Sequence, residues 1–86
     1  MEKIKKIKEN IDLKELEKYG YEKENGMYVK HTNDTDYGYQ VNISIDPYTR
    51  IIEKCFCWTC FSFNVEKYIQ DLIKADYVEE IEWENE

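Results

Sequence analysis

The residues from Tyr39 to Ile45 alternate strictly between apolar and polar side chains, and this alternation constrains the fold more than any other feature. A period of two is typical of a β-strand with one buried face. Asp46 and Pro47 then favour a turn, because proline holds φ near the value of the second turn position. A second run, rich in β-branched, aromatic and cysteine residues, extends over 50–63. The pattern therefore predicts a β-hairpin.

The register of this hairpin stays open. A two-residue loop places Ile43 opposite Ile52 and brings Lys54 to the core face. A longer loop places Ile43 opposite Glu53 and turns Cys55 and Cys57 inward. Because a slip of one residue exchanges the two faces of a strand, the sequence leaves the buried side of the second strand undecided.

Two other stretches show the periodicity of helices. In residues 2–19, apolar residues recur at spacings of three and four with charges between them, and a break near Asp12 would leave a stronger helix over 13–19. Gly20 follows where a left-handed C-terminal cap is expected. After the hairpin, an apolar stripe predicts a second helix over 64–78.

Met27–His31 reads as a short first strand, preceded by the turn signal Asn25-Gly26. The predicted fold is therefore α+β, with the element order α-β-β-β-α. It consists of a three-stranded antiparallel sheet with two helices packed on one face.

Residues 1–86 are expected to form a single domain, near the lower limit of length at which one core supports a fold. Its acidic C-terminal tail, 79–86, is too charged for a core element, although Ile81 and Trp83 have the spacing of a short added strand. The chain has no run of about 18 apolar residues and no signal-peptide pattern. We therefore expect a cytoplasmic protein that does not bind membranes.

The formal net charge of −7 is unevenly distributed. Residues 1–8 carry four lysines and one glutamate, whereas residues 75–86 carry six acids and no base. This balance disfavours direct binding of nucleic acid, which depends on lysine and arginine to neutralise phosphates. It favours a protein partner with a basic surface. The alternative is that the acidity only keeps a small protein soluble.

Three cysteines lie close together in the stretch CFCWTC, at Cys55, Cys57 and Cys60. With His31 they could supply a Cys₃His zinc site, so a zinc-stabilised interaction module is an alternative function. In a continuous strand, however, Cys55 and Cys57 share a face and Cys60 points to the other. We therefore expect free structural thiols that the cytoplasm keeps reduced, and no cofactor.

We expect no enzymatic activity, because the single histidine and the three glycines fit no nucleophilic or phosphate-binding motif. The remaining candidate is a partner-binding surface that combines carboxylates with aromatic anchors. Its residues lie in the loop before the hairpin and in the tail: Asp34, Asp36, Tyr37, Glu79, Glu80, Glu82, Trp83 and Glu84.

In size, acidity, tyrosine content and single-domain α/β layout, the chain resembles small phage-encoded inhibitors of bacterial defence, the anti-CRISPR proteins in particular. The resemblance implies an inhibitor that mimics nucleic acid on a CRISPR effector nuclease, but it includes no motif and so implies no particular residue. Immunity proteins that neutralise a basic nuclease toxin share the same profile. A third hypothesis is a homodimer paired through the edge of the cysteine-rich strand.

Overall fold

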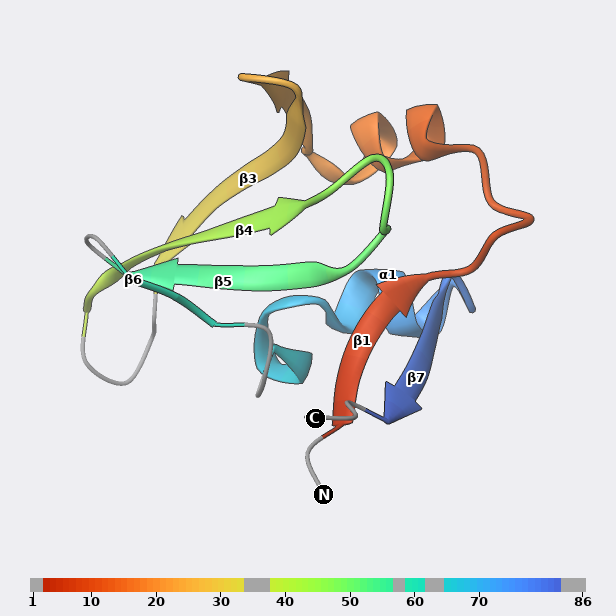
Figure 1. Ribbon diagram of the computed structural model, residues 1–86. Coiled ribbons are helices and arrows are strands. Elements are labelled where there is room, and N and C mark those ends of the chain that lie inside the picture. Colours follow the sequence, from red (N-terminus) through yellow and green to blue (C-terminus); the bar gives the residue numbers. More distant parts are fainter. Residues whose placement is uncertain (1–2, 34–37, 57–58, 62–64, 83–86) are drawn as a thin grey trace.

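The computed structural model describes residues 3–33, 38–56, 59–61 and 65–82 (Figure 1). Over these residues the backbone is mostly β. The strands are β1 (Lys3–Ile7), β2 (Glu22–Glu24), β3 (Met27–Asn33), β4 (Gln40–Ile45), β5 (Ile52–Phe56), β6 (Thr59–Phe61) and β7 (Val78–Glu82). The helical segments are the 3₁₀ helices η1 (Leu13–Tyr19) and η2 (Glu66–Tyr68) and the α-helix α1 (Gln70–Lys74).

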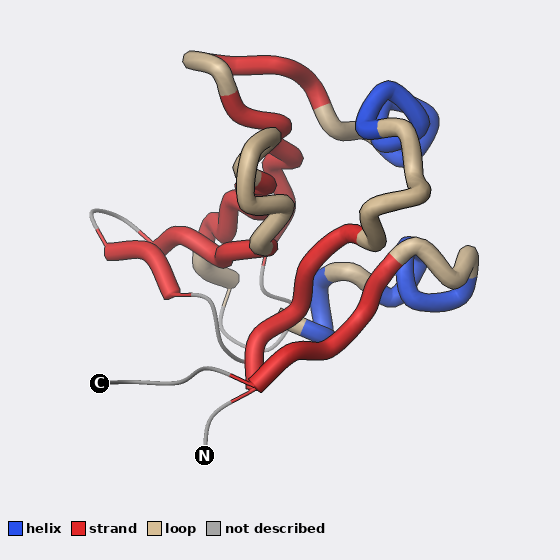
Figure 2. The backbone as a smooth tube through the Cα atoms, turned by 45° about the vertical axis from the view of Figure 1, so that its right-hand side comes forward, coloured by secondary structure: helices blue, strands red, loops and turns tan. Residues whose placement is uncertain are grey.

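The strands form two antiparallel sheets. The larger has the order β2-β3-β4-β5-β6, so each strand pairs with its neighbour in the sequence. The smaller is a ribbon of β1 and β7, which brings residues 3–7 and 78–82 side by side (Figure 2). A single bridge between Lys6 and Ile51 connects the ribbon to the start of β5.

The predicted α-β-β-β-α fold, with three strands and two helices, is therefore wrong. Residues 3–7 form a strand instead of a helix, and the predicted helix over 64–78 is reduced to η2 and α1 among the described residues. In residues 3–7 the apolar positions are the β-branched Ile4 and Ile7, which fit a pleated surface at least as well as a helix. The deciding term for β1 is its pairing with β7, which is distant in the sequence.

The shorter helix over 13–19 and its cap are confirmed, although the helix is 3₁₀ and not α. The carboxylate of Asp12 accepts a hydrogen bond from the backbone N–H of Lys14 at 3.0 Å, which satisfies one free donor of the first turn. Gly20 has φ 92°, and its N–H bonds back to the last turn. A side chain at this φ would be strained, so glycine ends the helix here.

The predicted hairpin of Tyr39–Ile45 with the next strand is confirmed as β4 and β5, but neither predicted register is correct. Ile45 lies opposite Ile52 and Ile43 opposite Lys54, so the connection over 46–51 is six residues long. Lys54 thus shares the core face with Ile43, as the shorter loop would also have placed it. The turn signal Asn25-Gly26 is confirmed too, with φ 51° and 80° between β2 and β3.

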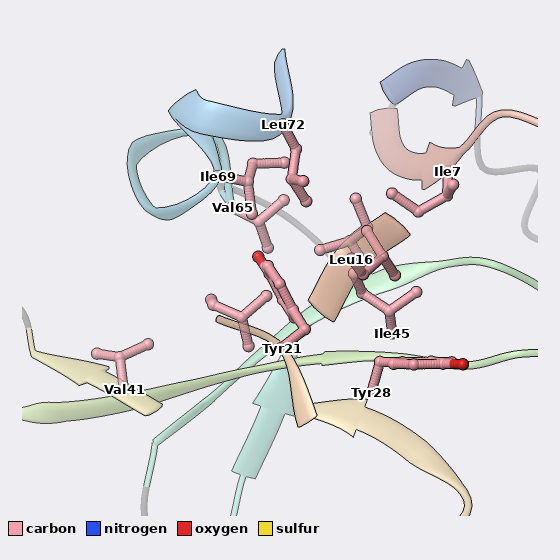
Figure 3. Close-up of a cluster of buried hydrophobic side chains, with 11 residues drawn as sticks. Ile7, Leu16, Tyr21, Tyr28, Val41, Ile45, Val65, Ile69 and Leu72 are labelled. Atoms are coloured by element: carbon pink, nitrogen blue, oxygen red, sulfur yellow. The ribbon is translucent and has the colours of Figure 1, made fainter. Parts of the chain in front are cut away.

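The core lies on one face of the larger sheet, where η1, η2 and α1 pack together with β1 (Figure 3). Strands β3, β4 and β5 contribute one wall through alternate residues, as their period of two requires. The buried residues of this cluster are Ile7, Leu16, Tyr21, Tyr28, Val41, Ile43, Ile45, Ile52, Val65, Ile69 and Leu72.

Cys55 is part of a disulfide and lies half-buried on the opposite face of the sheet, across from Asn42. The expectation of free structural thiols is therefore wrong for Cys55. A zinc site with three thiolates is also not available while this sulfur is oxidised. Cys57 and the side chain of Cys60 lie outside the described residues.

No helix in the described parts of the chain is long and apolar enough to span a bilayer.

Candidate functional site

The ribbon of β1 and β7 places lysines opposite glutamates. Both strands also carry apolar residues, and Ile4 and Ile7 of β1 are fully buried. Opposite charges on facing residues stabilise an antiparallel strand pair, so they favour the pairing of the basic strand β1 with the acidic strand β7. The facing pairs are Lys3 with Glu82, Lys5 with Glu80, and Lys6 with Glu79.

Lys5 is the centre of the ion pairs on this ribbon. Its ammonium bonds to Glu80 and, at 2.8 Å, to Glu66 of η2, and its side chain is only 14% exposed. Burial by itself lowers the pKa of Lys5, but the hydrogen bonds to the two carboxylates outweigh burial and raise it. The bond from Lys5 likewise lowers the pKa of Glu80. Lys5 and Glu80 therefore stay ionised at neutral pH, and the bond from Lys5 to Glu66 links η2 to the ribbon.

An open groove of about 320 Å³ lies between the ribbon and the helical segments. Ile73 and Val78 contribute apolar surface to it, and Ile73 is 37% exposed. The remaining lining is charged or polar and comes from Lys5, Glu66, Gln70, Glu79 and Glu80. Three carboxylates face one ammonium in this groove, so it is apolar in part and negative overall.

β7 is also an edge strand. Among the described residues it pairs only with β1, and Figures 1 and 2 show it on the outer side of the ribbon. Glu79 and Glu82 have no ion pair within the described parts of the chain, whereas Glu80 is paired with Lys3 and Lys5. In the described structure the strand therefore presents two carboxylates without an ion pair, and that of Glu79 lines the partly apolar groove. Such a surface can receive a cationic side chain together with its aliphatic stem.

A second polar cluster lies on the uncovered face of the larger sheet. His31 bonds through Nδ1 to Asn42 at 2.8 Å and through Nε2 to Glu24 at 2.9 Å. The bond to Asn42, followed by the bond and charge of Glu24, raises the pKa of His31 above its usual value. The carboxylate orients the ring and stabilises its protonated form.

This cluster lacks an accessible nucleophile in the described structure. Cys55 lies in the next strand, opposite Asn42, with Sγ 3.8 Å from the hydroxyl oxygen of Ser44. Its sulfur is oxidised, and only a free thiolate would act with a histidine as a nucleophile. The arrangement is therefore an oriented histidine on a sheet surface.

The structure brings together part of the binding surface expected from the sequence. Glu79, Glu80 and Glu82 lie on one strand. The other expected binding residues, Asp34, Asp36, Tyr37, Trp83 and Glu84, lie outside the described residues, as does Trp58.

Sequence reasoning missed the other groove residues, above all Lys5, Glu66 and Ile73. The available signal was the opposite charge of the segments 1–8 and 75–86, combined with the strand-like spacing of Ile81 and Trp83. That signal favours pairing between the ends. It does not show that 66–74 folds back over them.

Comparison of the chain with protein-family models, curated proteins and solved structures found no match. The fold and the ribbon therefore define a small two-sheet protein with an acidic edge strand, and its function has to be argued from that surface.

Proposed function

We propose that this chain is a non-enzymatic acidic protein that docks on the basic surface of a nucleic-acid-handling protein and inhibits it, as an anti-CRISPR protein inhibits a CRISPR effector nuclease. The observation that carries the proposal is the edge strand β7, on which Glu79 lines the groove and Glu79 and Glu82 form no ion pair within the described residues. Proteins that hold nucleic acid present lysine and arginine to phosphates, and carboxylates can occupy the same positions.

The charge of the whole chain supports the same partner. The lysines of β1 are neutralised locally, by Glu80, Glu66 and Glu9, so they offer little free positive charge. Much of the net charge of −7 therefore remains for long-range attraction to a basic surface. The proposal includes a cytoplasmic location, where such a target acts. The disulfide at Cys55 does not support that part, because cytoplasmic thiols are mostly reduced.

The test is inhibition of a panel of CRISPR effector nucleases loaded with guide RNA, together with a basic nuclease toxin. Cleavage of target DNA and complex formation on native gels are measured with and without the protein. We expect one panel member to be inhibited through a complex that weakens as salt rises from about 50 to roughly 300 mM, because exposed charges are screened. Inhibition of the toxin alone would identify an immunity protein.

A matched pair of variants gives the control. Glu79→Gln with Glu82→Gln removes two charges that make no ion pair in the described structure but face Lys6 and Lys3 across the ribbon, so circular dichroism of the variant first checks that the fold is retained. Glu17→Gln removes an exposed charge on η1. Absence of a complex with every enzyme of the panel, or a complex insensitive to salt, would contradict the proposal.

A further inference from the structure

We propose that the open edge of β7 binds an extended, basic segment of the partner protein by strand addition, with cationic side chains entering the adjoining groove. This inference rests on the proposed function and specifies how the partner is held. It names the secondary structure and the chemistry of the segment that docks.

The first support is the backbone of β7. Through the described residues its inner edge pairs with β1 over the full length Val78–Glu82, and no second strand pairs with its outer edge. The backbone N–H and C=O groups of an open edge form a template for another strand. Peptides that add to such an edge gain affinity from main-chain hydrogen bonds and specificity from side-chain positions.

The second support is the charge of the edge, which discriminates against a second copy of this chain. Antiparallel self-pairing centred on Glu80 would place two carboxylates directly opposite each other. Parallel in-register pairing would align Glu79, Glu80 and Glu82 with their own copies. Like charges opposite each other destabilise a strand pair. A strand rich in arginine or lysine is attracted by these carboxylates.

The third support is the position of the groove along the strand. Val78 and Glu80 are two residues apart along β7 and therefore share a face of the strand. Both line the groove together with Ile73 of α1. An arginine stem can cover the apolar surface of Ile73 and Val78, while its guanidinium reaches carboxylates of Glu66, Glu79 or Glu80. Lys3 and Lys5 already pair with Glu80 and Glu66, so of the three groove carboxylates that of Glu79 is left, among the described residues, for one incoming cation.

The test uses three synthetic peptides of equal length as probes, measured by fluorescence anisotropy. One alternates arginine and valine, one alternates glutamate and valine, and the third keeps the arginines but replaces the valines with proline. The proline peptide has the same charge as the first but lacks half of the backbone donors. We expect the arginine–valine peptide to bind and the glutamate peptide not to bind. The proline peptide should bind about tenfold more weakly.

Two further readouts locate the site. Amide hydrogen exchange over residues 78–82 should slow when the arginine–valine peptide binds. Glu79→Gln with Glu82→Gln should weaken that peptide about tenfold, whereas Glu17→Gln should leave it unchanged. Equal binding of the proline peptide, or protection elsewhere in the chain, would overturn strand addition at β7.

Inhibition and complex formation with the enzyme panel distinguish a failure of this inference from a failure of the proposed function. If a nuclease is inhibited and the β7 variant inhibits it equally well, the partner docks elsewhere and only this inference fails. If the peptide binds β7 but no enzyme of the panel forms a complex, the edge site stands and the proposed inhibitor function fails. Failure of the arginine–valine peptide to bind at all would overturn the edge site.

Discussion

Tyr21 places a polar atom in the core without a partner. The residue is 1% exposed, and among the described residues its hydroxyl accepts and donates no hydrogen bond. Figure 3 shows the hydroxyl pointing toward Val65. Burial, together with the charge of Asp71, raises the pKa of this hydroxyl well above its usual value, so it is neutral at physiological pH. An unsatisfied buried hydroxyl costs about 1–3 kcal/mol.

Tyr21→Phe should therefore raise the free energy of unfolding by about 1 kcal/mol, because it removes the hydroxyl and leaves the ring. The contact between the ring and the ammonium of Lys30, 5.6 Å from its centroid, is kept. Urea unfolding measures the change. Tyr48→Phe is the control, since Tyr48 is 92% exposed and should be neutral. A loss of stability in Tyr21→Phe would show that the hydroxyl has a favourable partner.

His31 makes the stability depend on pH near neutrality. Its pKa is raised above 6.5 in the folded state, first by the bond to Asn42 and then by Glu24. The protonated form is thus favoured by folding. The contribution of protonated His31 to the free energy of unfolding is fully present below pH 6.5 and is lost as the pH rises through the folded-state pKa. The effect should be small, because the side chain is 50% exposed.

An NMR titration of the His31 ring tests this directly. Asn42→Ala and Glu24→Gln should each lower the measured pKa toward 6.5, whereas Glu17→Gln should not change it. If neither Asn42→Ala nor Glu24→Gln moves the pKa, the two hydrogen bonds are not formed in solution.

At the scale of elements, Arg50 fastens the turn between β4 and β5 to the segment that follows β1. Its guanidinium donates to the backbone carbonyls of Lys8 and Ile11, both at 2.7 Å, and lies 3.4 Å from a carboxylate oxygen of Glu9. Its own carbonyl accepts from the N–H of Ile7 at 2.9 Å. The side chain is 18% exposed, so these bonds are partly shielded from water.

Arg50→Ala should lower the free energy of unfolding by about 2–3 kcal/mol, because hydrogen bonds from a charged donor are lost. Arg50→Gly should cost about 1 kcal/mol less than alanine, although it loses the same bonds. The backbone φ of 65° strains alanine but suits glycine. Urea unfolding of both variants gives the comparison. An alanine variant as stable as the parent would contradict the role of the guanidinium.

The elements that the sequence predicted well depend on neighbouring residues. β4 follows from alternation within one strand, the turn at Asn25-Gly26 from residues that accept positive φ, and the end of η1 from Gly20. In each case the favoured conformation arises within a few residues, so no distant contact is needed to choose it. The helix predicted over 2–19 forms only at η1. Ile4 and Ile7 are three residues apart, which also fits a strand that is buried on both faces, so the periodicity did not distinguish a helix from β1.

At the scale of the whole molecule, the ribbon of β1 and β7 decides the architecture. It pairs residues 3–7 with 78–82 and buries Ile4 and Ile7. The same pairing creates both the acidic edge and the groove. Binding residues were expected at Glu79, Glu80 and Glu82 in an acidic tail, for which a short added strand was left open, and the structure places them in β7. Their pairing with β1 neutralises Glu80 and leaves Glu79 and Glu82 without ion pairs in the described structure.

The amino-acid sequence by itself determined the β4–β5 hairpin, the cap at Gly20, the turn at Asn25-Gly26 and the excess of negative charge. Only the tertiary structure decided the register at Ile45 and Ile52, the oxidised state of Cys55 and the pairing of the two chain ends. For the pairing of β1 with β7 the physical reason is sequence separation, and for the register it is the anchoring of the connection 46–51 by Arg50 to Lys8 and Ile11, which are distant in the sequence. Local propensities are weak, of the order of 1 kcal/mol per residue, and burial or strand pairing between distant segments can outweigh them.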